Sequence, residues 1–184
     1  VRFFGGFGFG QADALAPDVA RAGYTKGVPM GGELERDQKG RAPSFLLSAL
    51  RDPDGAHLDR IQIIKGWRDA SGELHERIYD VAVSGDRKIG RDGRCREPVG
   101  NTVDVSAARY TNAIGASQLI AVWQDPDFDP DLHSFYYARV IEIPKPRWTT
   151  YDAARFGVPR PEGVEATTQD RAYTSPIWYA PGDG

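Results

Sequence analysis

The pattern of hydrophobic positions along the chain is organised around residues 134–144, Ser-Phe-Tyr-Tyr-Ala-Arg-Val-Ile-Glu-Ile-Pro. Aromatic and β-branched residues dominate it and no turn residue interrupts it, which is typical of a β-strand. Read with a period of two, it has two apolar faces, one with Phe135, Tyr137, Ile141 and Ile143 and the other with Tyr136, Ala138 and Val140. A strand that is apolar on both faces is normally covered on both. The pattern therefore predicts a central strand of a sheet.

Arg139 is the one charged side chain in the middle of this segment, on an otherwise apolar face. Burying a charge is costly unless the charge is paired and hydrogen-bonded. We therefore expect Arg139 to be largely buried and to bind either a carboxylate or backbone carbonyl groups.

Residues 58–67 alternate between apolar and polar positions, and residues 74–83 form a second strand-like segment. The residues between them include Asp69-Ala-Ser-Gly72, a sequence rich in residues that favour tight turns. This arrangement predicts a β-hairpin.

Shorter apolar segments predict further strands at residues 1–4, 43–50, 102–105, 116–124 and 173–179. Pro176 indicates an edge position for the last of these, because proline cannot donate a ladder hydrogen bond. Two short helices are indicated, a turn at residues 17–22 and a helix at residues 151–156. For the second helix, Thr150 is the expected N-cap, and Gly157 the expected C-terminal cap.

Many short strands with at most two short helices predict an all-β fold, an antiparallel β-sandwich. With 184 residues, we expect one domain over residues 1–184. The chain starts at Val1 in a strand-like segment, so we expect it to be part of a longer protein.

The net charge of −3 gives no electrostatic argument for binding nucleic acid or an anionic membrane. No apolar segment approaches the ~20 residues of a membrane-spanning helix. The single cysteine, Cys95, excludes an internal disulfide and a thiolate metal site. It lies in the basic segment 84–100, which we interpret as a mobile surface loop, with a phosphate-binding patch as the alternative.

Four aspartates alternate at positions 125, 127, 129 and 131, and hard cations bind several oxygen ligands. Asp125, Asp127 and Asp129 are thus candidate calcium ligands. An EF-hand loop would need glycine at its sixth position and glutamate at its twelfth, where this chain has Pro130 and Tyr136. We therefore expect a rigid acidic turn without metal, with calcium binding as the alternative.

No catalytic constellation is visible in the sequence. The three histidines, His57, His75 and His133, are far apart and belong to no metal-binding pattern. Cys95 has no histidine partner nearby in the sequence. We predict no catalytic residue and no cofactor in this chain.

The cluster Lys145-Pro-Arg-Trp148 with Tyr151 is a candidate ligand site. Arginine binds carboxylates or phosphates through two parallel hydrogen bonds, and tryptophan or tyrosine stacks on sugars and aromatic ligands. Arg147, Trp148 and Tyr151 are therefore the candidate binding residues. The alternative is that Trp148 belongs to the core and Arg147 caps a strand edge.

Long ordered strings of the sequence resemble one known family. They are Tyr24-Thr-Lys-Gly-Val-Pro-Met-Gly-Gly32, Leu58-Asp-Arg-Ile-Gln-Ile-Ile-Lys-Gly-Trp67, Gly100-Asn-Thr-Val-Asp104, Trp123-Gln-Asp-Pro-Asp-Phe-Asp-Pro130, Phe135-Tyr-Tyr-Ala-Arg-Val-Ile-Glu-Ile-Pro144, Pro146-Arg-Trp-Thr149 and Thr174-Ser-Pro-Ile-Trp178. Together they are similar to the C-terminal part of domain-of-unknown-function family 3604. The resemblance covers nearly the whole chain and is weakest over residues 84–97.

The resemblance implies a longer protein whose N-terminal part is similar to the PHP (polymerase and histidinol phosphatase) metallohydrolases. Those enzymes hold divalent metals with His, Asp and Glu residues, all upstream of Val1, so no ligand is carried onto this chain. In PHP-type hydrolases of similar layout a β-sandwich follows the catalytic barrel, and the resemblance also suggests an exported or periplasmic protein. The chain is thus expected to be an accessory domain packed on an upstream catalytic domain. The alternative is an independent module that binds a sugar or an envelope partner.

Overall fold

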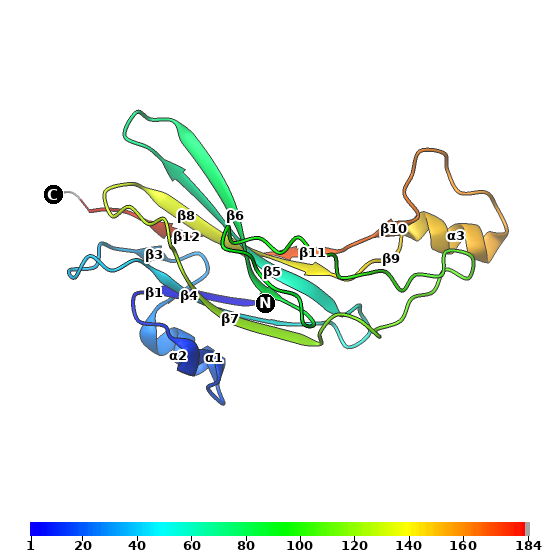
Figure 1. Cartoon of the computed structure of the whole chain (residues 1–184), viewed down its shortest axis with the longest axis horizontal. Helices are drawn as coiled ribbons and strands as arrows, with labels where there is room; N and C mark the ends of the chain where they lie inside the picture. Colours follow the sequence, from blue (N-terminus) through cyan, green and yellow to red (C-terminus); the bar gives the residue numbers. More distant parts are fainter. Residues whose placement is uncertain (183–184) are drawn as a thin grey trace.

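Two β-sheets packed on each other form the body of the protein, as the predicted β-sandwich requires (Figure 1). The computed structural model describes residues 1–182. The first sheet has the strand order β2 (Val28–Pro29), β1 (Arg2–Gly6), β4 (Ser44–Leu50), β7 (Gln118–Gln124). The second has the order β3 (Glu33–Leu34), β12 (Ile177–Tyr179), β8 (Ser134–Glu142), β5 (Leu58–Arg68), β6 (Leu74–Val83), and β11 (Arg171–Tyr173) also pairs with β8.

The core lies between the two sheets and is built from large aromatic and aliphatic side chains. Phe45 of β4 is at its centre, with its ring centroid 5.4 Å from that of Phe3 and 4.5 Å from that of Tyr136. The side chains of Ile61 and Ile63 on β5 are also fully buried there. Aromatic pairs at these separations add to the hydrophobic contribution of burial.

The central position of β8 is confirmed, because β8 pairs with β5 on one side and with β12 and β11 on the other. Its inner face, Tyr136, Ala138 and Val140, is buried. The expected cover on the other face is not present: Phe135 and Tyr137 are only half-buried. No second layer packs over this part of the face in the described structure, so its aromatic residues remain accessible.

The prediction for Arg139 was wrong about the bonding partner. Its side chain is half-buried on the outer face of β8, and its Nε donates a 2.8 Å hydrogen bond to Oε1 of Gln62 on β5. The partner is thus a side-chain amide rather than a carboxylate or a backbone carbonyl. The open outer face explains this, because a solvated guanidinium does not require a charged partner.

The predicted hairpin is confirmed as β5 and β6, which pair along almost their whole length. The N–H of Gly72 donates a 2.9 Å hydrogen bond to the Asp69 carbonyl, and Gly72 has a φ of +89°. The Asp69 carboxylate accepts hydrogen bonds from the backbone N–H groups of Ser71 and Glu73. Asp and Gly at these positions therefore supply the turn, as the sequence indicates.

Of the shorter predicted strands, those at 1–4, 43–50 and 116–124 correspond to β1, β4 and β7. Residues 102–105 form no strand but an isolated bridge from Asp104 to Arg109, where the Asp104 carboxylate accepts the N–H of Ser106. The predicted strand 173–179 is divided into β11 and β12, and β12 lies between β3 and β8 rather than at an edge. Pro176 stands in the break, where no ladder hydrogen bond is required of it.

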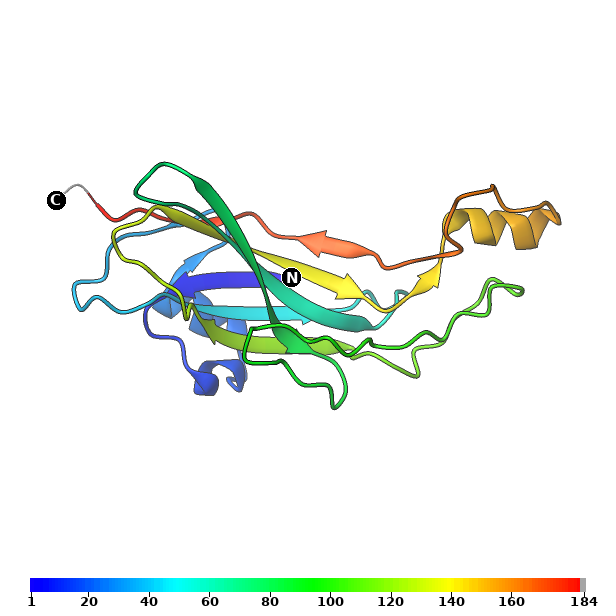
Figure 2. The ribbon, with the colours of Figure 1, turned by 45° about the horizontal axis from the view of Figure 1, so that its top comes forward.

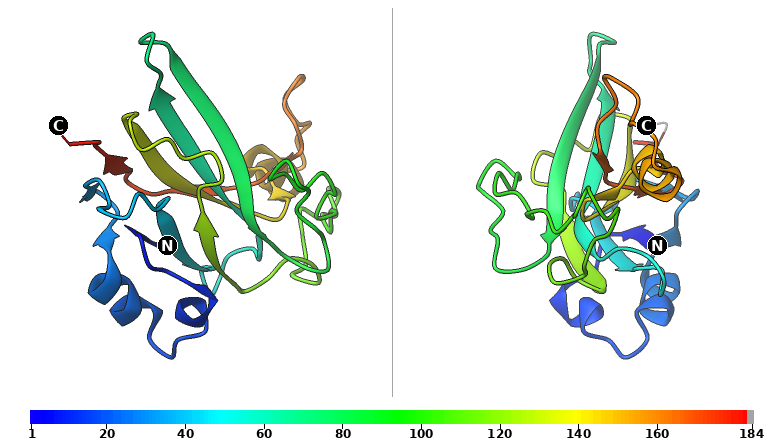
Figure 3. Two further views of the ribbon diagram at one scale, coloured as in Figure 1. Left: turned by 60° about the vertical axis from the view of Figure 1, so that its left-hand side comes forward. Right: turned by 90° about the vertical axis from the view of Figure 1, so that its right-hand side faces the viewer.

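The helices differ in detail from the prediction, which allowed one or two. The structure has α1 (Gln11–Ala14), α2 (Val19–Lys26) and α3 (Trp148–Phe156). Helices α1 and α2 cover the outer face of the first sheet (Figure 3), where Phe4, Phe9 and Leu46 form a second core. None of the described helices is long and apolar enough to span a membrane.

Helix α3 begins three residues earlier than expected, with Arg147 rather than Thr150 at the N-cap. The Thr150 hydroxyl instead donates to the Ala166 carbonyl at 2.7 Å. Gly157 closes the helix in the left-handed region, φ +64°, as predicted. With β9 (Lys145–Pro146) and β10 (Thr167–Thr168), α3 forms a projection at one end of the molecule, which we call the arm, residues 145–168 (Figures 1 and 2).

Candidate functional site

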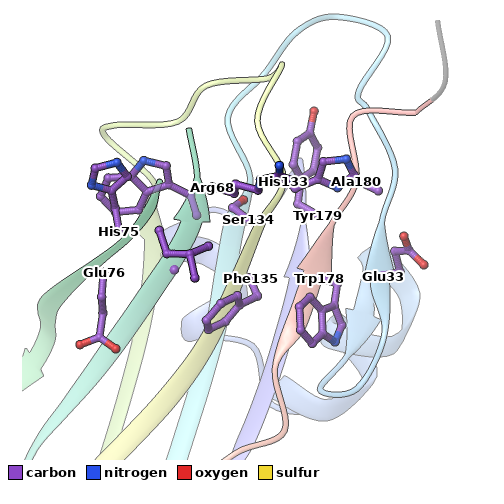
Figure 4. Close-up of a pocket in the computed structure, with 13 residues that line it drawn as sticks. Glu33, Arg68, His75, Glu76, His133, Ser134, Phe135, Trp178, Tyr179 and Ala180 are labelled. Carbon is purple, nitrogen blue, oxygen red and sulfur yellow. The ribbon is translucent and has the colours of Figure 1, made fainter. Parts of the chain in front are cut away.

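An open groove of about 760 Å³ lies at the end of the second sheet (Figure 4), opposite the arm (Figure 1). Its lining includes Glu33, Gly66, Leu74, Glu76, Phe135 and Trp178. Trp178 is 50% exposed and Leu74 is 79% exposed. Large apolar side chains in an open groove are typical of binding surfaces. We call this hollow the aromatic groove.

Strand register builds the floor of the aromatic groove. Phe135 on β8 lies directly opposite Trp178 on β12 and opposite Gly66 on β5, and Gly66 in turn lies opposite Glu76 on β6. Residues opposite each other share one face of a sheet. A Cβ at Gly66 would come within 2.3 Å of the Phe135 ring. Glycine thus lets the ring of Phe135 lie over β5, with its centroid 5.3 Å from that of Trp178.

The aromatic surface continues along β8 beyond the groove. The centroid of Tyr137 lies 6.4 Å from that of Phe135 and also 6.4 Å from that of Tyr173 on β11. Burial and the nearby carboxylate of Glu76 raise the pKa of Tyr137, so its phenol stays protonated at neutral pH. The four side chains Trp178, Phe135, Tyr137 and Tyr173 form what we call the aromatic row.

Past the aromatic row, arginines line a second hollow of about 310 Å³ on the same face, which we call the arginine pocket. Arg139 and Arg60 reach it from the central strands, and Arg171 from β11. The Nε of Arg139 is bound to Gln62. Within residues 1–182, the terminal nitrogens of Arg139 and the whole guanidinium of Arg171 have no hydrogen-bond partner in the protein.

Two buried aspartates support this pocket. Asp80 accepts a 2.7 Å hydrogen bond from the Cys95 N–H and one of the same length from the Gln62 amide. Burial raises the pKa of Asp80, but these hydrogen bonds and the charges of Arg60 and Arg94 outweigh burial and leave the pKa below its ordinary value. Asp80 is therefore ionised at neutral pH.

The second aspartate, Asp59, binds Arg87 at 2.6 Å and Arg60 at 3.2 Å. Arg87 and Arg94 belong to the segment 84–100, which was interpreted as a mobile loop with a free basic patch as the alternative. These two arginines are instead paired with buried carboxylates, and Cys95 is 6% exposed. Arg87 and Arg94 thus anchor this segment to the sheet.

The predicted ligand residues Arg147, Trp148 and Tyr151 do lie together, at the start of α3 in the arm. Trp148 is 69% exposed and Tyr151 is 41% exposed, so the alternative that Trp148 belongs to the core is wrong. The Nε of Arg147 is shielded from solvent and lacks a partner within the described residues. Ligand binding by this cluster stays a prediction.

The alternating aspartates are engaged within the protein. Asp125 is buried and binds Lys65 at 2.6 Å and the Tyr136 hydroxyl at 2.7 Å. Asp127 binds Arg77 and the Tyr79 hydroxyl, at 2.7 Å and 2.6 Å. Burial and the charge of Asp125 raise the pKa of Tyr136, which therefore stays a donor. The first two carboxylates thus fix the 125–131 turn against β5 and β6.

The three histidines are not brought to one site. His57 hydrogen-bonds the Ile114 carbonyl near the arm, whereas His75 and His133 flank the aromatic groove. His75 lies 2.7 Å from Asp69, and Asp69, Glu73 and His75 place potential ligand atoms within 4.8 Å of one another. The Ser71 hydroxyl and the His75 ring hydrogen-bond the Asp69 carboxylate and hold its pKa well below its usual range. This group belongs to the hairpin turn, and exposed groups of this kind are common without a metal.

Sequence reasoning did not find the aromatic groove or the arginine pocket. One usable signal was Gly66 inside an otherwise apolar strand, since a strand glycine often marks the close approach of another group. The other was the central strand, where two of the three aromatic residues, Phe135 and Tyr137, fall on the same face.

A family model described as a protein of unknown function, DUF3604, matches residues 1–181. No curated protein and no solved structure matches the chain. The match covers both sheets, the arm, the aromatic groove and the arginine pocket.

Proposed function

The chain belongs to the DUF3604 family of proteins of unknown function, and from that premise we propose that it is a non-catalytic accessory domain. It docks through its arm on an upstream catalytic domain, the PHP-like metal-dependent hydrolase that the sequence resemblance implies. The divalent metal belongs to that upstream domain. The observation that carries this proposal is the exposed apolar surface of the arm.

Large apolar side chains cover the arm and face solvent. Trp148 is 69% exposed, Phe156 is 66% exposed and Val158 is 51% exposed. Tyr151 and Val164 add to this surface. Exposed apolar patches of this kind mark protein interfaces, and buried aromatic side chains are typical anchors of such interfaces. The arm thus has the composition of a docking element.

The arm is held in a fixed place on the sandwich. The Lys145 ammonium lies 3.2 Å from Glu142 and 2.7 Å from Asp170. The Ala166 carbonyl accepts hydrogen bonds from the Arg147 N–H and from the Thr150 hydroxyl, which join the two ends of the arm. These contacts fix the base of the arm and the first turn of α3, which carries Trp148 and Tyr151. That limits the conformational entropy lost when a partner binds.

Chemistry in the described residues supports a non-catalytic role. Metal-assisted hydrolysis needs about three ligands and an open position for water, and a nucleophilic route needs a nucleophile next to an oriented base. Here Asp125, Asp127 and Asp80 hold structural partners, and Cys95 is buried. His57 hydrogen-bonds the Ile114 carbonyl, and His75 hydrogen-bonds Asp69 in the hairpin turn.

The test is association of this chain with a separately produced PHP-like domain from a longer member of the family, measured by sedimentation velocity. We expect a complex that the double variant Trp148→Ser, Phe156→Ser abolishes. The matched control is Leu15→Ser, which changes a side chain 84% exposed on the α1 side of the molecule. No association, or loss of association in Leu15→Ser as well, would contradict the proposal.

The same mixture also tests the catalytic assignment. On a panel of phosphodiesters and carboxylic esters with manganese or zinc, we expect turnover only when the PHP-like domain is present. Turnover by the 184-residue chain alone, lost on replacing His57, His75 or His133, would move the active site into this chain.

A second candidate is an independent ligand-binding module. The observation that favours it is the aromatic groove, which lies away from the arm and is open to solvent. Both functions are compatible in one chain, because they use opposite ends of the molecule.

A further inference from the structure

We propose that the outer face of the second sheet binds an acidic oligosaccharide in which neutral sugars alternate with uronic acids. The site consists of the aromatic row and the arginine pocket. It does not depend on the docking proposal, since it shares no residue with the arm.

The aromatic row provides stacking platforms. Sugar rings present faces of C–H groups that pack on aromatic rings, and tryptophan and tyrosine offer such faces together with a polar atom. Trp178 and Tyr173 are 50% and 57% exposed, and Phe135 and Tyr137 join them into one continuous surface. A linear chain of sugars matches this shape better than a compact ligand does, because the row runs along β8.

The arginine pocket favours a carboxylate. Its lining has three arginines, 60, 139 and 171, and one carboxylate, Asp59. Asp59 is paired with Arg60 and Arg87, and the buried Asp80 behind it is paired with Arg60 and Arg94. Asp170, next to Arg171, is paired with Lys145. Among residues 1–182, Arg139 and Arg171 have no ion-pair partner and keep free N–H groups. A guanidinium fork matches the geometry of a carboxylate.

The opposite end of the face excludes a uniformly acidic ligand. Figure 4 shows Glu76 and Glu33 on the two flanks of Phe135 and Trp178. These two protein carboxylates would repel a carboxylate or phosphate of the ligand. They can instead accept hydrogen bonds from the hydroxyl groups of a neutral sugar. The face thus suits a neutral sugar on the Phe135–Trp178 pair and a uronic acid at the arginines. Nucleic acid, with a phosphate at each residue, does not fit this charge pattern.

The test is titration of the 184-residue chain with hyaluronan hexasaccharide and unsulfated chondroitin hexasaccharide, in which glucuronate alternates with a neutral sugar. Binding is followed by calorimetry and by tryptophan fluorescence. Chitohexaose is the neutral comparison and hexagalacturonate the uniformly acidic one. Trp178→Ala is paired with the control Trp148→Ala, and Arg171→Gln with the control Arg160→Gln, an exposed residue of the arm. Circular dichroism confirms the fold of each variant.

We expect saturable binding of at least one alternating hexasaccharide, tighter than that of either comparison. Trp178→Ala weakens it by about tenfold, as loss of a stacking platform implies. Arg171→Gln weakens it by a similar factor, about tenfold, and reduces its salt dependence.

Three results would overturn the proposal. One is no saturable binding of either alternating hexasaccharide. Another is wild-type affinity in both Trp178→Ala and Arg171→Gln. The third is equal loss in Trp148→Ala, which would place the site on the arm. Because Arg171 is exposed, Arg171→Gln keeps the test valid if Trp178→Ala fails to fold.

Discussion

At the scale of single residues, ion pairs attach the 125–131 turn to strands β5 and β6. Lys65 on β5 has a side chain 5% exposed and binds the fully buried Asp125 at 2.6 Å. Arg77 on β6 binds Asp127 in the same turn, but both partners are nearly half exposed. The turn thus contains two similar ion pairs, one buried and one exposed, whose contributions to stability can be compared directly.

We expect Lys65→Met to lower the free energy of unfolding by about 3–5 kcal/mol, because the buried Asp125 would lose its counter-charge. The control Arg77→Met should cost about 1 kcal/mol or less, as exposed ion pairs do. Urea denaturation measures both. Equal losses would show that burial of the Lys65–Asp125 pair does not set its contribution.

Asp80 makes the free energy of unfolding depend on pH in the acidic range. Its folded-state pKa lies below the ordinary value of 3.8, so its contribution is complete above that pH and is lost as pH falls through the folded-state pKa. We expect Asp80→Asn to be less stable than the wild type at neutral pH, with a constant difference down to about pH 4 and a shrinking one below. Urea denaturation from pH 7 to pH 3 measures this. A difference that already shrinks above pH 5 would contradict the assignment.

At the scale of elements, the sequence pattern predicted those elements that are held by interactions between nearby residues. The β5–β6 hairpin follows from alternation together with Asp69 and Gly72, which specify the turn without distant partners. The parallel pairing of β3 with β12 joins residues at opposite ends of the chain, and nothing in either short segment specifies it. The division of residues 173–179 into two strands has the same cause, since distant partners fix both halves.

The aromatic groove depends on the close approach of two strands at Gly66, where the Phe135 ring of β8 lies over β5. We expect Gly66→Ala to cost about 1–3 kcal/mol, because the new methyl group displaces the Phe135 ring. The control is Gly8→Ala, where a Cβ meets no atom within 4 Å. Thermal unfolding gives the stabilities, and proton chemical shifts of Phe135 report its displacement. An unshifted ring in Gly66→Ala would contradict the described floor of the groove.

The 125–131 turn is expected to bind no calcium. The Asp125 and Asp127 carboxylates already hold Lys65, Tyr136, Arg77 and Tyr79, so a cation would have to replace these partners. Calorimetric titration with calcium should give only heats of dilution. A stoichiometric isotherm that disappears in Asp127→Asn would show the opposite.

At the scale of the whole molecule, the sequence predicted the sandwich but not its surfaces. The aromatic groove and the arginine pocket bring together β5, β6, β8, β11 and β12, and their register was not available from any one segment. The cluster of Arg147, Trp148 and Tyr151 was found because its members are neighbours in sequence. That Trp148 projects into solvent follows from the arm, which spacing alone did not reveal.

The central claim is that this chain is an accessory domain that docks through its arm. Hydrogen–deuterium exchange of the chain, alone and with the PHP-like domain, tests it most directly, because exchange reports protection along the whole backbone. We predict slower exchange in residues 147–164 on binding and unchanged exchange in β8 and β12. Protection of the outer face of β8 and β12, with the arm unchanged, would contradict the account.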